Sequence, residues 1–233
     1  MATYVLVHGA WSGAHGLRRV RAALQASGPQ VSTPSLTGVG ERVHLAHPGV
    51  GLATHVRDVV NHVLYEDLDD IVLLGFSYGG CVVTGAVDHI AARIRHLVYL
   101  DAFVPQDGQS VFSMTGTSSE AMRVGEPWFV PPADREFDDA EEAAFMNARR
   151  SPQPIGCFRE PVRLAQALED YPFTRTYIRA TADRPDAPFA AGFDAAALRA
   201  RCSTAWRFRE IATNHMVASN RPQELADLLG ELA

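Results

Sequence analysis

The feature that most constrains the fold is the segment 71–83, where apolar β-formers run directly into Gly-Phe-Ser-Tyr-Gly and then into a second small and apolar run. This pattern predicts a buried strand, a sharp turn and the start of a helix. Such a turn strains the backbone of Ser77, and Gly75 and Gly79 suit it because strand and helix pass too close there for side chains. The hydroxyl then stands above the sheet edge, so we interpret Ser77 as a nucleophile rather than as an incidental serine.

Short apolar strands alternate with amphipathic helices along most of the chain. We predict strands at 4–7, 30–33, 71–74, 96–100, 174–180 and 204–211. We predict helices at 16–27, 52–65 and 221–232, and one that follows the serine turn and continues to about residue 92. This alternation is typical of a parallel sheet with helices on both faces. We therefore expect an α/β fold with a six-stranded parallel sheet, built as one domain over residues 1–233.

The alternation breaks in the region 105–171, which collects prolines and scattered aromatic residues. Two acidic stretches there, at 138–148 and 160–168, have helical character, and no strand pattern is evident. We interpret 105–171 as a small inserted helical cap over the strand ends.

Composition narrows the classes of partner. The 233 residues carry a formal net charge of −6 and contain no lysine, so all 21 basic residues are arginine. Without a basic run we expect no nucleic-acid partner, and without lysine the chain cannot form a lysine Schiff base or a Walker-type phosphate loop. No apolar stretch approaches the length of a membrane span, so we expect no membrane partner.

The cysteines and the N-terminus favour a cytoplasmic protein. Cys81, Cys157 and Cys202 are far apart and do not follow the spacing of metal ligands. An odd number of such cysteines predicts free thiols in a reducing compartment. The first residues pass directly into strand sequence, without the pattern of a signal peptide. We expect no metal.

Chemically reactive residues fall at the predicted strand ends. In a parallel sheet the carboxyl ends of the strands form the ligand crevice. Ser77 follows the third strand, Asp183 the fifth and His215 the sixth, which is the order Ser…Asp…His expected for a serine turn on such a sheet. Histidine removes the serine proton and a buried carboxylate orients the histidine. We predict the catalytic residues Ser77, His215 and Asp183, with Asp101 after the fourth strand as the rival acid.

Two further aspartates, Asp186 and Asp194, lie close enough in sequence to be mistaken for Asp183. We predict that the backbone N–H groups of Ala10 and Tyr78 form the oxyanion hole, one from each side of the crevice. His8 ends the first strand, and we expect it to anchor the oxyanion loop through hydrogen bonds. The residues that we expect to contact substrate are Trp11, Phe76, Phe103, Trp128, Phe129 and Met216.

Six motifs together resemble one family. They are Val-Leu-Val-His-Gly-Ala-Trp (5–11), Leu-Thr-Gly-Val-Gly-Glu-Arg (36–42), Gly-Phe-Ser-Tyr-Gly-Gly (75–80), Leu-Asp-Ala-Phe-Val-Pro (100–105), Ala-Thr-Ala-Asp (180–183) and Asn-His-Met (214–216). They resemble the α/β-hydrolase superfamily, in the branch of plant methylesterases, hydroxynitrile lyases and their bacterial esterase relatives. The resemblance implies the strand order 2-1-3-4-5-6, a helical cap, a cofactor-free Ser-His-Asp triad and activity on small carboxylic esters.

Departures from the family pattern favour esterase over lyase activity. Hydroxynitrile lyases of this branch carry a threonine after the oxyanion-loop histidine and a lysine after the catalytic histidine, whereas this chain has Gly9 and Met216. A cyanide leaving group needs a nearby cation, and the chain has no lysine. Phe76 also stands at a position of the serine turn where members of this family often have histidine. The cap is shorter than in the plant enzymes. Both differences leave the identity of the substrate open.

We therefore expect a serine hydrolase that cleaves small carboxylic esters through an acyl-enzyme on Ser77. The alternatives are a lyase, a dehydratase or a secondary-metabolite tailoring enzyme that uses Ser77 and His215 as acid and base, a thioesterase, and a ligand-binding protein on a hydrolase scaffold. The cap aromatics favour an apolar or aromatic small-molecule ester. The oligomeric state is open, with a homodimer as one expectation.

Overall fold

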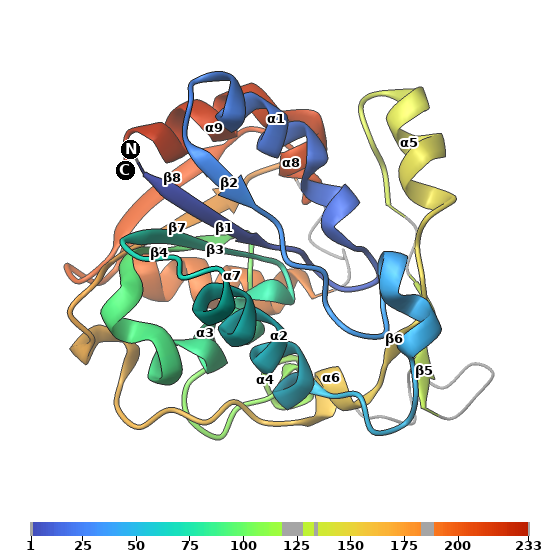
Figure 1. The fold of residues 1–233 in the computed structure, drawn as a ribbon, viewed down its shortest axis with the longest axis horizontal. Coiled ribbons are helices and arrows are strands. Elements are labelled where there is room, and N and C mark those ends of the chain that lie inside the picture. The colour runs from blue at the N-terminus through green and yellow to red at the C-terminus, as the bar shows by residue number, and fades with distance from the viewer. Residues whose placement is uncertain (1, 118–127, 133–134, 183–188, 233) are drawn as a thin grey trace.

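A parallel six-stranded sheet forms the centre of the computed structural model, which describes residues 2–117, 128–132, 135–182 and 189–232 (Figure 1). Its strands are β1 (Thr3–Val7), β2 (Gln30–Ser32), β3 (Ile71–Phe76), β4 (Ile94–Leu100), β7 (Thr174–Ala180) and β8 (Arg207–Ile211). Their order is β2-β1-β3-β4-β7-β8, and every neighbouring pair is parallel. Counted along the chain within this sheet, that order is the predicted 2-1-3-4-5-6.

Helices cover both faces of the sheet, as the alternating pattern predicts. On one face lie α1 (Arg18–Ala26) and α9 (Pro222–Gly230); on the other lie α2 (Leu52–Tyr65), α3 (Gly79–Ile90) and α7 (Ala190–Arg201). Successive side chains of β1 alternate between the two cores: Tyr4 and Leu6 join the first, Val5 and Val7 the second. Both faces are therefore buried, and the strands read as nearly continuous apolar runs.

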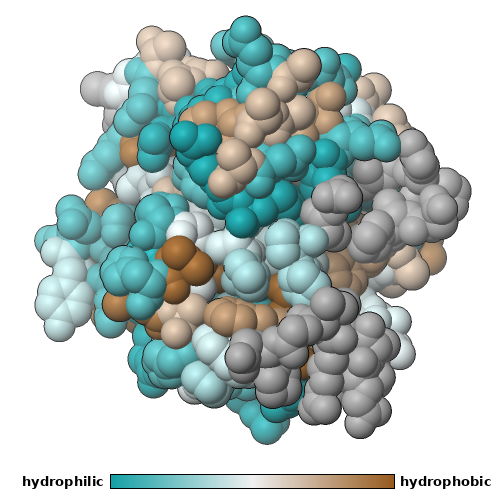
Figure 2. Space-filling model, turned by 90° about the vertical axis from the view of Figure 1, so that its right-hand side faces the viewer, coloured by the Kyte–Doolittle hydropathy of each residue, from teal (hydrophilic) through white to brown (hydrophobic). Residues whose placement is uncertain are grey.

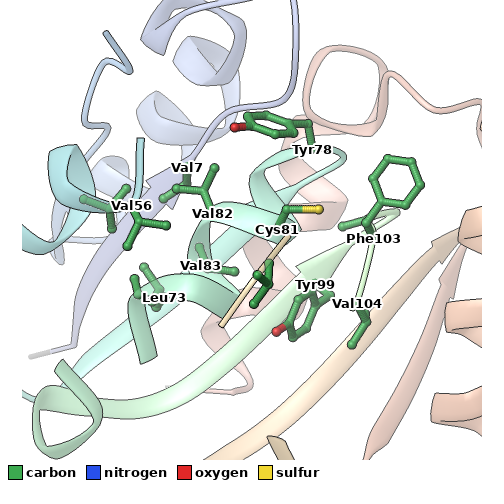
Figure 3. Close-up of a cluster of buried hydrophobic side chains, with 14 of the residues drawn as sticks. Val7, Val56, Leu73, Tyr78, Cys81, Val82, Val83, Tyr99, Phe103 and Val104 are labelled. Carbon is green, nitrogen blue, oxygen red and sulfur yellow. The ribbon is translucent and has the colours of Figure 1, made fainter. Parts of the chain in front are cut away.

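The larger core lies between the sheet and α3 (Figure 3). Val82 and Val83 of α3 pack with Leu73 of the central strand β3, and Val56 of α2 closes the cluster from outside. Cys81 points into this core and is 1% exposed, so burial raises the pKa of its thiol. Cys81 is thus a small core residue, as expected from its place after the serine turn.

Helix α7 has no counterpart in the sequence prediction. Its buried face is made largely of alanines, which differ little in hydropathy from the rest of this Ala-rich segment, so the helical period is weak.

Shorter helical segments connect these elements. They are η1 (Ala14–Leu17), η2 (Gly40–Leu45), η3 (Ala91–Arg93), η4 (Leu168–Asp170), α4 (Val111–Thr115), α6 (Gly156–Arg159) and α8 (Val217–Asn220).

The region 105–171 was expected to be a helical cap, but it also contains β-structure. It contains a two-stranded antiparallel ribbon, β5 (Phe129–Val130) and β6 (Gln153–Pro154), where no strand was expected. Strands of two residues are too short to show an alternating pattern. The first acidic stretch is helical, as α5 (Ala140–Asn147), and the Asp139 carboxylate caps its N-terminus.

The second expected cap helix, at 160–168, is wrong. The N–H of Val162 donates to the carbonyl of Gln109 (2.8 Å), and the N–H of Leu164 donates to the Asp107 carboxylate (3.0 Å). Tertiary partners therefore take the backbone donors that a helix would use. Pro161 also disfavours helical geometry at the residue before it, so α6 ends there.

Trp11 fastens this region over the end of β1. Its indole Nε1–H donates to the carbonyl of Val130 (3.0 Å), and its backbone N–H donates to Gln153 Oε1 (3.0 Å). Its carbonyl accepts from the N–H of Ser151 (3.2 Å).

The side of the molecule that carries α5, β5 and β6 faces the viewer in Figure 2. Apolar side chains show near the centre of this face, between hydrophilic regions.

A buried carboxylate ties α5 to the body of the molecule. Glu142 is 1% exposed and accepts from Arg18 Nη1 (2.7 Å) and from Ser219 Oγ (2.9 Å), and its second oxygen lies 3.0 Å from Arg19 Nε. Burial acts to raise the pKa of Glu142, but hydrogen bonds from Arg18 and Ser219 outweigh it and hold the pKa below its usual value. The carboxylate therefore joins the cap to α1 and α8.

We expect Glu142→Gln to lower the free energy of unfolding by about 1–3 kcal/mol, because Arg18 and Arg19 lose their shared anion. A carboxylate with a depressed folded-state pKa stabilises the protein above its unfolded pKa of about 4.3, and this stabilisation is lost as the pH falls through the folded value. The difference between variant and wild type in urea unfolding should thus shrink in acid. Glu141→Gln, an exposed neighbour on the same helix, is the control; an equal loss there would contradict the assignment.

None of the helices within the described ranges is both long and apolar enough to cross a membrane.

Candidate active site

Ser77 lies at the sharp turn between β3 and α3, as predicted. Its φ is 56°, a left-handed conformation that is uncommon for a residue with a side chain. A Cβ added to Gly75 would lie 2.7 Å from the carbonyl oxygen of Gly79, and one added to Gly79 would lie 2.6 Å from the carbonyl oxygen of Val7. The expected crowding of strand and helix is therefore confirmed, and both positions require glycine.

His215 lies directly against the serine. The Ser77 hydroxyl is 2.9 Å from His215 Nε2, which suits donation of its proton to an imidazole with its own N–H on Nδ1. His215 is 4% exposed, and its ring lies between Phe76 (centroids 4.8 Å apart) and Phe193, which is stacked on it (4.9 Å, 12°). Phe193 belongs to α7 and was not foreseen. The two rings fix the plane of the imidazole.

The carboxylate on the far side of His215 is that of Asp101, the rival acid. His215 Nδ1 lies 2.6 Å from Asp101 Oδ2, and Asp101 is completely buried. Asp183, the predicted acid, lies outside the described residues, as does Asp186. Asp101 follows β4, which neighbours β3 in the sheet, so its side chain emerges beside Ser77. Its φ of 41° is a conformation that aspartate tolerates better than most residues.

Arg179 pairs with the second oxygen of the same carboxylate. Asp101 Oδ1 accepts from the Arg179 guanidinium and from the N–H of Ala180 (3.2 Å). The other end of the guanidinium donates to Asp194 Oδ1 at 2.7 Å. Burial acts to raise the pKa of Asp101, but the hydrogen bond with His215 and the charge of Arg179 outweigh it, so the pKa lies below its usual value. Asp101 is thus held as a carboxylate.

The loop after β1 passes closely over Ser77. A Cβ added to Gly9 would lie 2.9 Å from the Cβ of Ser77, and Ala10 lines the same pocket as Ser77. Neither the N–H of Ala10 nor that of Tyr78 donates to any residue within the described ranges. Both groups are thus free to bind a ligand oxygen, as the predicted oxyanion hole requires.

Two buried histidines hold the elements that carry these N–H groups. His8 Nδ1 donates to the carbonyl of Gly9 (2.9 Å), and His8 Nε2 accepts from the N–H of Leu36 (3.2 Å). Burial lowers the pKa of His8 to about 4, so it is neutral at pH 7 and can act as both donor and acceptor. The expected anchoring of the oxyanion loop by His8 is therefore confirmed.

His55 is the second of these histidines, and it holds Tyr78 at the serine turn. Its Nε2 donates to the carbonyl of Thr37 (2.8 Å), which leaves Nδ1 to accept from the Tyr78 hydroxyl (3.0 Å). Burial lowers the pKa of His55 to about 4, so this ring is also neutral. Sequence alone does not separate His55 from the other helical histidines, because the partners of its ring come from other elements.

A narrow pocket opens beside Ser77 and His215. Three of the residues expected to contact substrate, Trp11, Phe76 and Met216, line it. The other three do not: the Phe103 ring packs against Phe193 (centroids 4.8 Å apart), and the rings of Trp128 and Phe129 lie on each other (3.7 Å). The lining also includes Ser12, Gly16, Leu17, Arg135, Met146 and Arg150.

In the part of the chain that the structure describes, no group of three or more His, Cys, Asp and Glu side chains is placed to hold a metal ion.

Comparison with known proteins gives a consistent match. The family model described as "Alpha/beta hydrolase family" matches residues 4–228. A carbendazim hydrolyzing esterase from Nocardioides sp. (strain SG-4G) is 36% identical over 252 residues, which cover 100% of both chains. An alpha-hydroxynitrile lyase from Arabidopsis thaliana is 32% identical over 108 residues, which cover 44% of this chain and 40% of the lyase.

Among solved structures, an extracellular alpha/beta-hydrolase from a Paenibacillus species superposes with a TM-score of 0.84 at 24% identity. The match covers 100% of this chain and 99% of the other. This likeness shows the same fold.

Proposed function

Because the chain belongs to the alpha/beta hydrolase family and is an ester-cleaving enzyme of that family, we propose that it hydrolyses small carboxylic esters through an acyl-enzyme on Ser77. The observation that carries the proposal is the hydrogen-bonded series Ser77 Oγ–His215–Asp101, with distances of 2.9 and 2.6 Å. In this proposal Asp101 replaces Asp183 as the acid.

The geometry supports a two-step mechanism. Ser77 Oγ attacks the ester carbonyl while His215 Nε2 takes its proton, and Asp101 stabilises the imidazolium that forms. The N–H groups of Ala10 and Tyr78 stabilise the negative oxygen of the tetrahedral intermediate. Collapse of that intermediate breaks the bond to the alcohol, which leaves with the proton from His215. Water then attacks the acyl-enzyme and gives a proton to His215. As the bond between the acyl group and Ser77 Oγ breaks, His215 returns that proton to Oγ, which releases the acid and regenerates the Ser77 hydroxyl.

The pocket wall supports an apolar or aromatic substrate. Trp11, Leu17, Phe76, Met146 and Met216 line it and present apolar surface beside the nucleophile. The full-length similarity to an esterase supports hydrolysis over the lyase alternative, and so does the absence of lysine from the chain. Hydrolysis of a thioester would use the same residues in the same steps.

We retain the cytoplasmic location and the cofactor-free mechanism as predictions. Cys81, Cys157 and Cys202 are all free thiols in the structure, which is in keeping with a reducing compartment. A homodimer likewise stays a prediction.

The mechanism is tested by trapping the acyl-enzyme. We expect p-nitrophenyl acetate turnover, and rapid acid quench followed by mass spectrometry should find one acetyl group on the peptide that contains Ser77. A fluorophosphonate should label the same serine. Ser77→Ala should lose both modifications, whereas Ser203→Ala, at an exposed loop outside the pocket, should keep them. Turnover with an unmodified Ser77 would instead support acid-base chemistry of the lyase type.

A further inference from the structure

The hydroxyl of Ser12 is a buried polar group that no described residue satisfies. Ser12 is 8% exposed, and its Oγ has no hydrogen-bond partner in the described part of the chain. Buried polar side chains almost always have such a partner, so each exception needs an explanation. Ser12 also lines the pocket that contains Ser77 and His215. Its missing partner can therefore be a bound substrate.

Local backbone groups do not compete for this hydroxyl. The N–H of Trp11 is taken by Gln153, that of Ala14 donates to Glu41 Oε1 (3.3 Å), and that of Gly16 donates to the carbonyl of Gly13 (3.0 Å). Serine hydroxyls often form hydrogen bonds with nearby backbone groups, but the N–H groups near Ser12 already have other partners.

The surroundings make room for the hydroxyl at one defined place. A Cβ added to Gly16 would lie 2.5 Å from Ser12 Oγ and 3.5 Å from Met146 Cε, so the hydroxyl occupies space that only a glycine at position 16 leaves open. Gly16, Leu17 and Met146 line the same pocket. The Ser12 hydroxyl therefore lies against Gly16, next to apolar residues of the pocket lining.

Arg135 and Arg150 also line the pocket, and an arginine side chain offers hydrogen-bond donors but no acceptor. Ser12 lies two residues beyond Ala10, the proposed oxyanion donor, and two residues span at most about 7 Å. An acceptor that reaches Ser12 would therefore be only a few bonds from the ester carbonyl.

We propose that Ser12 is a specificity-determining residue that donates a hydrogen bond to an acceptor atom of the substrate, such as an ether oxygen, a carbonyl oxygen or a ring nitrogen near the scissile ester. The preferred substrates are then esters with such an acceptor on the acyl or the alcohol part, rather than esters with hydrocarbon chains alone. This inference rests on the proposed ester hydrolysis at Ser77. A site built to bond a polar substrate group discriminates against the analogue that lacks it.

Matched ester pairs test the inference. p-Nitrophenyl methoxyacetate and p-nitrophenyl butyrate differ by one ether oxygen in place of a methylene on the acyl side, and 2-methoxyethyl acetate and butyl acetate differ likewise on the alcohol side. The ratio of kcat/KM within each pair is compared between wild type and Ser12→Ala, so the intrinsic reactivity of the esters cancels. We expect the variant to lose about 10- to 100-fold of the preference for the ether in one pair.

The pair that responds shows which part of the substrate Ser12 contacts. Ser27→Ala is the control, because the Ser27 hydroxyl donates to the carbonyl of Leu24 outside the pocket, and it should change neither ratio. If the esters are turned over but Ser12→Ala changes neither kcat/KM ratio by more than twofold, the proposed role of Ser12 is overturned. The proposed ester hydrolysis at Ser77 would then still stand. No turnover and no acylation of Ser77 in the wild type would overturn the proposed function itself.

Discussion

Replacing Asp101 by asparagine is expected to lower kcat about 10⁴-fold. The asparagine Oδ1 would turn toward the two donors on its outer side, the Arg179 guanidinium and the N–H of Ala180. Its NH2 group would then face His215 Nδ1, which would have to become an acceptor. That forces the ring proton onto Nε2, where it opposes the Ser77 hydroxyl and prevents proton removal.

Asp183→Asn is the matched comparison for this prediction. If Asp101 is the acid, Asp101→Asn loses activity, keeps its circular dichroism spectrum and binds substrate with a nearly unchanged KM, while Asp183→Asn keeps kcat within about tenfold. The opposite pattern, with activity lost only in Asp183→Asn, would return the acid to the position that the sequence favoured.

Arg179→Met is expected to lower the free energy of unfolding by about 3 kcal/mol and kcat/KM by roughly 10- to 100-fold. The substitution leaves the buried Asp101 carboxylate with His215 as its remaining ionic partner and frees Asp194. The groups bonded to this carboxylate in the described structure are then His215 and the N–H of Ala180. When the Asp101 carboxylate is held less firmly, it also positions the His215 ring less precisely.

Acid unfolding separates this electrostatic role from a purely structural one. Arg179 helps to hold the pKa of Asp101 below its usual value, so its removal should make acid unfolding begin at higher pH. Arg179→Lys should restore much of the wild-type acid-unfolding curve. Arg201→Met, which breaks a surface pair with Glu210, should not shift it.

The sequence was sufficient to predict the contact between Ser77 and His215 but not to choose between Asp101 and Asp183. Ser77 and His215 could be placed because each follows a well-marked strand, and the structure brings them within 2.9 Å. Asp101 and Asp183 follow β4 and β7, which are neighbours in the sheet. Both strand ends therefore open onto the same region, and only the direction of the side chains decides which carboxylate reaches the ring.

Arg179 and Phe193 were missed for different reasons. Leu100 pairs with Ile178 across β4 and β7, so the next positions, Asp101 and Arg179, oppose each other at the strand ends. That juxtaposition needs the register, which the sequence alone does not provide. Phe193 lies on α7, whose alanine-rich period was too weak to predict the helix. The short ribbon in the cap was missed because two-residue strands carry no pattern.

The position of Asp101 also has a consequence for how the site assembles. One β–α–β unit, β3–α3–β4, supplies both the serine and the carboxylate, so their placement depends on a short loop closure within neighbouring chain. His215 is 138 residues from Ser77 along the chain and joins them only when β8 docks at the edge of the sheet. Formation of the Ser77–Asp101 frame is thus a local event, whereas the contact with His215 depends on long-range docking. Loosening of the C-terminal segment would separate His215 from this frame while the frame itself stays folded.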